Sequence, residues 1–304
     1  MSGRTIQLGG HRVEVSRADK VLFPRDGLTK GDIAEYYHRV GSTLVRYTKD
    51  RPLASERYPD GIEGQRIFQK NVSARTPGWV RRVEVPKREG GRNIQVVCEE
   101  PDTLVHLADQ GVLTPHVWLS RTDDLERPDR MVFDLDPSDN GVEELRSAAH
   151  HTRRLLEEVG LPAFVMTTGS RGFHVLVPLR REDTFHRVRE FARGIATVLS
   201  ERSPELLTVE QRKEDRAGRV FVDYLRNSYA QTTVAPYSVR ARDTAPVATP
   251  ISWRELDEVG PRGFTLGDVP ERLATHGDEW SGIGNRATSL TRPRRRLAEL
   301  RSGS

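Results

Sequence analysis

The chain has 304 residues, which is enough for one large domain or two ordinary ones with their own hydrophobic cores. Hydrophobic residues make up 36% and charged residues 30%, and no apolar run approaches the roughly 18 residues of a membrane-spanning helix, which argues against a membrane protein. The N-terminus lacks the apolar core of a secretion signal, and the single cysteine, Cys98, excludes an internal disulfide and a cysteine-based zinc cluster. We therefore expect a cytoplasmic protein in which Cys98 is a small buried hydrophobic residue.

The charges nearly balance, with 48 basic and 44 acidic residues, but the basic residues are mostly arginine and they cluster. Dense stretches lie at 75–92, 211–219 and 292–296. A planar guanidinium matches the geometry of a phosphate, so a polyanionic partner is one interpretation. A solvated, arginine-rich surface explains the same pattern, and charge alone does not decide between the two.

Helices and strands are mixed along the chain. The spacing of apolar residues predicts helices at 28–47 with Thr29 as N-cap, at 103–113, at 141–160 with Gly160 closing the helix, at 185–202 and, in short form, at 252–256. Strands are expected at 130–137, on both sides of a turn in 163–179, and at 219–227, whereas 232–242 is either extended or a loop. This mixture indicates an α+β fold with mixed central β-sheets flanked by helices. Residues 286–304 are expected to form a flexible basic tail.

The stretch MVFDLDPSDN, 131–140, carries two aspartates, Asp134 and Asp136, at the end of an apolar strand. Side chains alternate along a strand, so both carboxylates should lie on one face. Neighbouring carboxylates repel each other unless they are solvated or share a cation. With Asp223 from another predicted strand they would form an oxygen cage for Mg²⁺ or Mn²⁺, and two such ions can polarise a phosphoryl group.

The turn TTGSRGFH, 167–174, adds groups that suit a phosphate chain: hydroxyls, backbone N–H groups freed by glycine, and the cation of Arg171. His174 could face the same site from the next strand. Each feature alone has an ordinary explanation, because paired aspartates often cap or support structure, a lone Asp223 is usually a surface residue, and a lone histidine is usually packed. Only their combination favours a site for phosphoryl transfer.

Six stretches occur in this order: DKVLFP…LTK, RYPDG…FQKN, HVWLSRTDDLERPDRMVFDLDP, TTGSRGFHVLVPL, VFVDYLRN and TTVAPYSVRAR. They resemble the polymerase domain of bacterial ligase D, a branch of the archaeo-eukaryotic primase superfamily, from about residue 10 to about residue 285. The resemblance implies a primase-like catalytic core and a template-dependent nucleotidyltransferase of non-homologous end joining. Such enzymes fill gaps and extend broken DNA ends, often prefer ribonucleotides and favour Mn²⁺.

The resemblance also assigns roles to individual residues. The catalytic and metal-binding triad, which holds two divalent ions (Mn²⁺ or Mg²⁺), is matched by Asp134, Asp136 and Asp223. The residues that hold the NTP or dNTP are matched by Thr168, Ser170, Arg171, His174 and Arg240, with His116 beside them. The lysines that bind the DNA 5′-phosphate are matched by Lys20 and Lys30, the aromatic residue that packs on the template by Phe68, and basic positions near nucleic acid or nucleotide by Arg57 and Arg216.

The implied partners are gapped or broken double-stranded DNA with a 5′-phosphate, the Ku protein and a separate ATP-dependent DNA ligase, with a nucleoid-associated place in the cytoplasm and no membrane. The sequence contains no K-x-D-G ligase nucleophile and no His/Asp-rich nuclease segment, so we expect a stand-alone polymerase or one excised from a longer protein. Residues 1–285 should form one primase–polymerase domain, with a portion that binds DNA ends over about 1–115 and a catalytic portion over about 116–285.

Three residues depart from the family's pattern. Glu56 stands where a lysine often precedes the arginine of the RYP stretch, so nucleotide affinity or sugar preference could differ. Arg17 stands in place of an asparagine near the 5′-phosphate site, where it would strengthen phosphate binding or alter its geometry. Ile67 replaces one of two aromatic residues at the template site and leaves Phe68 alone there.

Three other functions fit parts of the sequence. FDLDP resembles the FDLDG nucleophile strand of haloacid-dehalogenase-like phosphatases, but Pro137 and Ser138 follow where a Thr or Val is expected. A non-catalytic DNA-end-binding module would share the fold, yet three clustered carboxylates without a metal would be electrostatically unfavourable. A primase that starts chains de novo stays open, and a primer-free assay would discriminate it from a primer-dependent polymerase.

Overall fold

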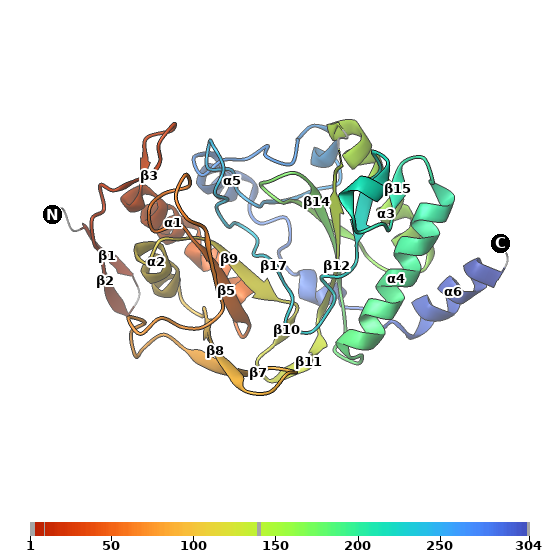
Figure 1. Ribbon diagram of the computed structural model, residues 1–304, viewed down its shortest axis with the longest axis horizontal. Coiled ribbons are helices and arrows are strands. Elements are labelled where there is room, and N and C mark those ends of the chain that lie inside the picture. The colour runs from red at the N-terminus through yellow and green to blue at the C-terminus, as the bar shows by residue number, and fades with distance from the viewer. Residues whose placement is uncertain (1–3, 9, 139–140, 303–304) are drawn as a thin grey trace. The chain divides into compact units, whose positions relative to one another are not determined.

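The polypeptide passes back and forth between two units in the computed structural model, which describes residues 4–8, 10–138 and 141–302 (Figure 1). The first unit comprises Met1–Asp123, Thr232–Thr249 and Phe264–Asp278, and the second comprises Asp124–Gln231, Pro250–Gly263 and Glu279–Ser304. The expected division into 1–115 and 116–285 therefore misses the return of later segments to the first unit. The return has a physical cause, because β17 (Thr232–Val234) pairs with β9 (Val112–Trp118).

An antiparallel sheet of six strands forms the centre of the first unit, in the order β17-β9-β5-β8-β7, with β6 paired to β5. The other four strands of this sheet are β5 (Pro52–Arg57), β6 (Ile67–Gln69), β7 (Arg82–Pro86) and β8 (Arg92–Val97). The unit also contains β1 (Arg4–Leu8), β2 (His11–Val15), β3 (Val21–Phe23), β4 (Leu28–Thr29), α1 (Lys30–Thr48), α2 (Pro101–Asp109), β10 (Ser120–Arg121) and α5 (Asp268–His276). Helices α1 and α2 pack on each other and on β9. Cys98 is free and buried, as predicted.

Helix α1 begins where the sequence predicts, because Thr29 and Asp32 form a reciprocal capping box at its first turn. Its apolar stripe, including Ile33, Tyr37 and Leu44, is buried. Helix α2 is shorter than the predicted 103–113 and ends at Asp109. Gly111 follows in the left-handed region, with φ of +78°, and this conformation turns the chain into strand β9.

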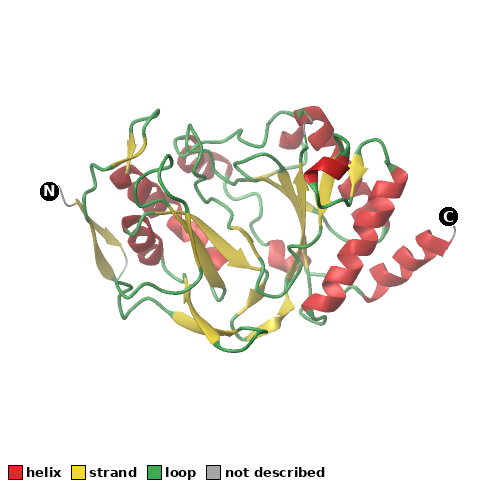
Figure 2. Cartoon of the chain, viewed as in Figure 1, coloured by secondary structure: helices red, strands yellow, loops and turns green. Residues whose placement is uncertain are grey.

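The second unit is built on a mixed sheet of six strands in the order β15-β16-β12-β14-β13-β18, in which only β15 and β16 run parallel. Its elements are β11 (Asp124–Pro128), β12 (Arg130–Asp136), α3 (Val142–Glu158), β13 (Phe164–Thr167), β14 (Phe173–Pro178), α4 (Phe185–Arg202), β15 (Leu207–Thr208), η1 (Lys213–Arg216), β16 (Val220–Asp223), β18 (Pro250–Ile251), η2 (Glu255–Asp257), η3 (Ile283–Arg286) and α6 (Thr291–Ser302). The two sheets and their helices confirm the predicted fold class of mixed sheets flanked by helices (Figure 2).

Helices α3 and α4 pack on each other and on strand β12, and so cover one face of this sheet (Figure 1). Phe133 and Leu135 of β12 are fully buried, whereas the intervening Asp134 and the terminal Asp136 are partly exposed. The alternation that the sequence predicts is therefore present, and it leaves both aspartates on the face opposite the helices.

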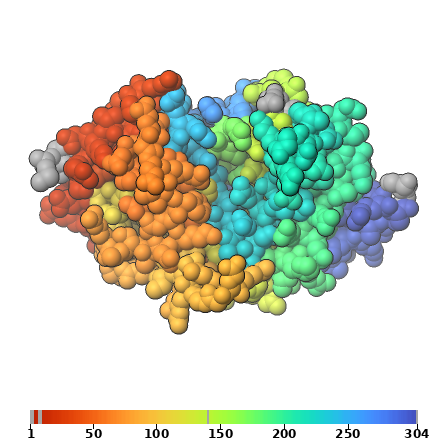
Figure 3. All heavy atoms as spheres, viewed as in Figure 1, coloured from red at the N-terminus to blue at the C-terminus, as the bar shows by residue number. Residues whose placement is uncertain are grey.

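Two local predictions in this unit differ from the structure. Strand β16 ends at Asp223 rather than near 227, because the Asp223 carboxylate accepts the backbone N–H of Leu225 and turns the chain. In place of a flexible tail over 286–304, residues Thr291–Ser302 form α6, which packs against α4 and buries Leu297. On the face shown in Figure 3, the stretch from α4 to η1 (green to teal) forms much of this unit's surface.

Among the described residues, no helix combines the length and the apolar character needed to cross a membrane.

Candidate active site

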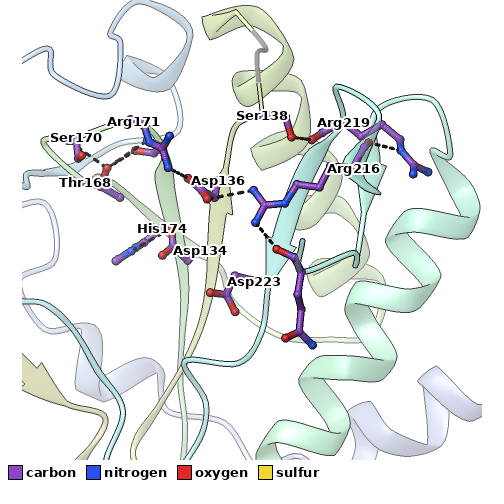
Figure 4. Close-up of polar contacts among 12 residues, drawn as sticks. Asp134, Asp136, Ser138, Thr168, Ser170, Arg171, His174, Arg216, Arg219 and Asp223 are labelled. Atoms are coloured by element: carbon purple, nitrogen blue, oxygen red, sulfur yellow. Dashed lines mark hydrogen bonds and ion pairs between the residues drawn. The ribbon is translucent and has the colours of Figure 1, made fainter. Parts of the chain in front are cut away.

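Strand register brings the three predicted carboxylates together at neighbouring strand ends (Figure 4). Asp134 on β12 lies directly opposite Asp223 on β16 and, on its other side, opposite His174 on β14. The His174 Nε2 atom is 3.5 Å from Asp134 Oδ1. Asp136 lies two residues further along the same face of β12. The sequence predicted this set from separate motifs, and the sheet assembles it.

Asp134, Asp136 and Asp223 repel one another when they are ionised, which makes the charged form of each carboxylate less stable. The pKa of Asp223 is raised above its ordinary value, first because the group is buried and then because the negative charge of Asp134 faces it. A group of hard oxygen atoms with excess negative charge is the donor set that Mg²⁺ and Mn²⁺ prefer. The residues present therefore fit a divalent cation.

Asp136 is held by two arginines. The Arg216 Nη1 atom lies 3.2 Å from one carboxylate oxygen, and the Arg171 Nη2 atom lies 3.1 Å from the other. Arg216 is only 7% exposed, donates to the backbone carbonyl groups of Glu210 and Gln211, and lies over the ring of Phe221. Its contacts show a side chain that orients Asp136 rather than one free to meet nucleic acid.

Arg226 is a site residue to which the sequence reasoning assigned no role. Its Nε atom lies 3.7 Å from Asp134 Oδ2 and 3.6 Å from Asp223 Oδ2, so one guanidinium faces both carboxylates. The signal was present in VFVDYLRN, because Arg226 follows Asp223 by three residues, but nothing in the sequence shows that a turn brings it back.

The turn between β13 and β14 is ordered by Thr168, which is buried. Its hydroxyl donates to the carbonyl of Gly172 and accepts the backbone N–H groups of Ser170 and Gly172. Arg262 donates to the carbonyl of Ser170 from a later segment of the same unit. The guanidinium of Arg171 is about half exposed and reaches Asp136 (Figure 4), so the turn presents a cation beside the carboxylates.

The other predicted nucleotide ligands, His116 and Arg240, belong to the first unit. There they lie close to Glu56, whose carboxylate is 3.4 Å from His116 Nε2 and feels the charge of Arg240. Phe68, the predicted template contact, is 43% exposed and meets the His116 ring edge-on, with centroids 5.7 Å apart. The structure therefore brings His116, Arg240 and Phe68 together around Glu56.

Arg57 lies on the opposite face of the same sheet from Phe68. Glu56 pairs with Phe68, whereas Arg57 pairs with Ile67, and neighbouring strand residues point to opposite faces. Arg57 donates to the carbonyl of Gln110 and to Oε1 of Gln69. Its pKa is lowered by burial and by the positive charge of Arg75.

The two predicted 5′-phosphate ligands have neighbouring backbones but separate side-chain partners. The Lys30 N–H donates to the carbonyl of Lys20. The Lys20 ammonium binds Asp60 at 2.8 Å. Lys30 as a residue is 5% exposed, and its ammonium binds Asp109 at 2.8 Å and Ser16 at 3.0 Å. Each ammonium would have to exchange or share a carboxylate partner to reach a common phosphate.

A further group that could hold a metal ion lies in the first unit, where His11, Glu100 and Asp102 place one ligand atom each within 4.8 Å of one another. Glu100 is the N-cap of α2, and Asp102 accepts the backbone N–H of His11. The positive end of the helix dipole already favours carboxylates at this position, so their presence does not require a cation.

The fold and the carboxylate site together define a class, the metal-dependent enzymes that transfer a nucleotidyl group. The family described as LigD, primase-polymerase domain, matches residues 29–280. The chain therefore belongs to this family, as the sequence predicted, and a polymerase domain implies the use of a divalent metal ion and nucleoside triphosphates.

Individual relatives agree with this assignment. The multifunctional non-homologous end joining protein LigD of Mycolicibacterium smegmatis is 33% identical over 270 residues, which are 88% of this chain and 35% of that protein. The protein of the same name from Pseudomonas aeruginosa is 36% identical over 274 residues, covering 89% of this chain and 32% of that protein. The chain thus spans about a third of the length of these relatives.

A solved structure matches the fold. The polymerase domain from Mycobacterium tuberculosis ligase D in complex with DNA aligns with a TM-score of 0.85 at 33% identity, covering 91% of this chain and 99% of that chain.

Proposed function

We propose that this protein is a template-dependent polymerase that fills gaps and extends DNA ends during non-homologous end joining. In this proposal it uses two divalent ions and prefers ribonucleoside triphosphates to deoxyribonucleoside triphosphates. The observation that supports it most directly is the register of Asp134 opposite Asp223, with Asp136 on the same face. Membership of the LigD primase-polymerase family and the likeness to a solved polymerase domain bound to DNA support polymerase activity on DNA.

Asp134, Asp136 and Asp223 would hold the divalent ions. When bound, such ions lower the pKa of an attacking hydroxyl and neutralise charge on a phosphoryl group. The chain's own residues prepare this site: Arg216 fixes the orientation of Asp136, and its burial keeps that orientation rigid. His174, 5% exposed, lies beside Asp134, with Nε2 3.5 Å from Oδ1 of that carboxylate.

Arg171 would meet the phosphates of the incoming nucleotide. Its guanidinium is 54% exposed and lies at the mouth of the turn, so it can leave Asp136 for a phosphate without breaking a buried contact. Thr168 and Ser170 would act through the turn, because the Thr168 hydroxyl is committed to holding the backbone. In the first unit, His116 and Arg240 would bind the nucleotide and Phe68 would pack on the template base.

Recognition of the DNA end would fall to Lys20 and Lys30. A 5′-phosphate offers more negative charge than one carboxylate, so it can compete for both ammonium groups. Arg57 and Arg216 donate to backbone carbonyl groups of the protein itself, and both are proposed as supports for their neighbours rather than as direct DNA ligands. Ku and a separate ATP-dependent ligase are the proposed partners that would complete a repair.

A gapped duplex with a 5′-phosphate tests the proposal. With Mn²⁺ and each NTP or dNTP, the wild type should extend the primer by templated addition, and Asp134→Asn and Asp223→Asn should each lower the rate at least about 1,000-fold. Glu201→Gln is the matched control, because Glu201 is an exposed carboxylate on α4. Absence of extension by the wild type under all conditions, with DNA binding intact, would instead favour a non-catalytic end-binding module.

Two comparisons in the same assay refine the proposal. Removing the 5′-phosphate should weaken binding in the wild type but not in a Lys20→Ala, Lys30→Ala variant. Equal rates with and without a primer would identify a primase that starts chains de novo.

A further inference from the structure

One face of the first unit's sheet carries a group of cations around a single buried carboxylate. Glu56 on β5 lies directly opposite Phe68 on β6. His116 on β9 pairs with Ala54, two residues before Glu56, so its side chain is on the same face. We call Glu56, Arg66, Phe68, His116 and Arg240 the Glu56 cluster.

The buried carboxylate of Glu56 is paired with basic side chains. Only 6% of the residue is exposed. The Arg66 Nη2 atom lies 2.5 Å from Oε1, and the His116 Nε2 atom lies 3.4 Å from the same oxygen. Burial opposes ionisation, yet the combined effect of His116, Arg240 and Arg66 lowers the pKa of Glu56 to about 2. Glu56 is therefore an anion throughout the physiological range.

Arg66 reaches outward, whereas the carboxylate of Glu56 that anchors it is buried. The Arg66 side chain is 58% exposed and its guanidinium lies 6.0 Å from the centroid of the Phe68 ring. Phe68 in turn meets His116 edge-on. Arg66 and His116 are thereby each restrained on one side by the carboxylate and on another by the aromatic ring, and the exposed guanidinium of Arg66 retains donors for a further partner.

A carboxylate at position 56 would be unexpected if its negative charge faced the triphosphate of the nucleotide. The family resemblance expects a lysine there, and a lone anion would repel a triphosphate. A buried carboxylate is stable only when it is paired, and here the paired cations outnumber it. The neighbouring basic groups Arg66, His116 and Arg240 thus supply the positive charge that a lysine would supply.

We propose that Glu56 is a positioning residue that holds the side chains of Arg66 and His116 in place for the phosphate oxygens of the incoming nucleotide. This inference rests on the proposed polymerase function and names the groups that hold the substrate's phosphates. Glu56 does not touch the substrate. It fixes the direction of Arg66, and its negative charge 3.4 Å from Nε2 favours the protonated form of His116.

The other titratable groups near the Glu56 cluster either add positive charge or are uncharged at physiological pH. Arg240 and Arg242 contribute positive charge around Glu56 and Tyr58. Burial, and then the charge of Glu56, raises the pKa of Tyr58, so this phenol is neutral at physiological pH. Within this set of neighbouring groups the anion is Glu56, so the Glu56→Gln substitution removes the negative charge of the set.

The test is the equilibrium affinity of Glu56→Gln for a nucleoside triphosphate and for the matching nucleoside, measured without primer so that no turnover occurs. Simple repulsion predicts that removing the anion strengthens triphosphate binding. Positioning predicts the opposite, a loss of about ten-fold for the triphosphate and less than about two-fold for the nucleoside. Unchanged or tighter triphosphate binding would overturn the inference.

The pH profile supplies a readout that a merely structural role would not move. In Glu56→Gln the loss of triphosphate affinity on raising the pH should begin at lower pH than in the wild type, because the carboxylate no longer favours imidazolium. Glu56→Asp should restore part of the affinity and of the profile. Coincident profiles for the wild type and Glu56→Gln would contradict the proposal.

Two variants guard the interpretation. Glu84→Gln removes a carboxylate that binds Arg92 at the same 2.5 Å distance but on an exposed surface, and should leave triphosphate affinity unchanged. Arg66→Gln changes a more exposed partner, and should weaken triphosphate binding even if Glu56→Gln fails to fold. Primer extension by the wild type is measured separately, so an inactive wild type refutes the polymerase proposal, whereas an active wild type with unaltered Glu56→Gln binding refutes only this inference.

Discussion

Gly172 is the position where the smallest chemical change should most disturb the carboxylates. A Cβ atom placed there would lie 1.9 Å from the backbone carbonyl oxygen of Leu135, whereas real Cβ contacts stay above 3.0 Å. Leu135 stands between Asp134 and Asp136 on β12. Because the obstacle is the backbone of the buried residue Leu135, no side chain can move to relieve the clash, and β12 must separate from the turn by about 1 Å.

The Gly172→Ala variant should therefore remain folded but lose activity. Forced overpacking costs about 1–3 kcal/mol of unfolding free energy. A displacement of about 1 Å at the catalytic groups should lower kcat about 100-fold. The assay is single-nucleotide addition on a gapped duplex, combined with thermal unfolding monitored by circular dichroism.

Gly284→Ala is the matched control, because a Cβ there meets nothing within 4 Å and the residue lies in η3 of the same unit. It should retain wild-type activity and stability. If Gly172→Ala extends primers within about three-fold of the wild-type rate, the close approach of the turn to Leu135 does not set the geometry of the carboxylates, and the reasoning fails.

Three further outcomes are expected. Asn227, which is fully buried, bonds both the N–H and the carbonyl of Val132, so Asn227→Ala should lower the free energy of unfolding by about 3 kcal/mol in urea titrations, and a loss below about 1 kcal/mol would contradict this role. Arg226→Gln removes the guanidinium that competes with Mn²⁺ for the carboxylates of Asp134 and Asp223. Mn²⁺ should therefore bind this variant about two- to five-fold more tightly than the wild type and raise its Tm by more. An equal rise in both proteins would count against competition. The pKa of Glu56 is lowered from 4.5 to about 2, so its stabilisation is complete above pH 4.5 and disappears as the pH falls toward 2. Between pH 6 and pH 3, Glu56→Gln should consequently lose less unfolding free energy than the wild type, and parallel losses would be inconsistent with the lowered pKa.

Several elements could be predicted because their signals are local. Apolar spacing predicts a helix at 185–202, and α4 has the same bounds, since the signals for its periodicity and its termini are contained in the segment itself. Thr29 and Asp32 likewise define the start of α1 through groups three residues apart. Helix α6 escaped prediction because its sequence is highly polar, and it is Leu297 packing against α4 that supports it.

The candidate site divides in the same way. Alternation along one strand determined that Asp134 and Asp136 share a face, and motif order was enough to identify the family. Only the tertiary structure decided that Asp136 would accept a hydrogen bond from Arg216, eighty positions further along the chain. It also decided that Arg66 and His116 would lie beside the carboxylate of Glu56. The physical reason is that strand pairing and ion pairing across sequence-distant segments depend on register and burial, which no single stretch of sequence specifies.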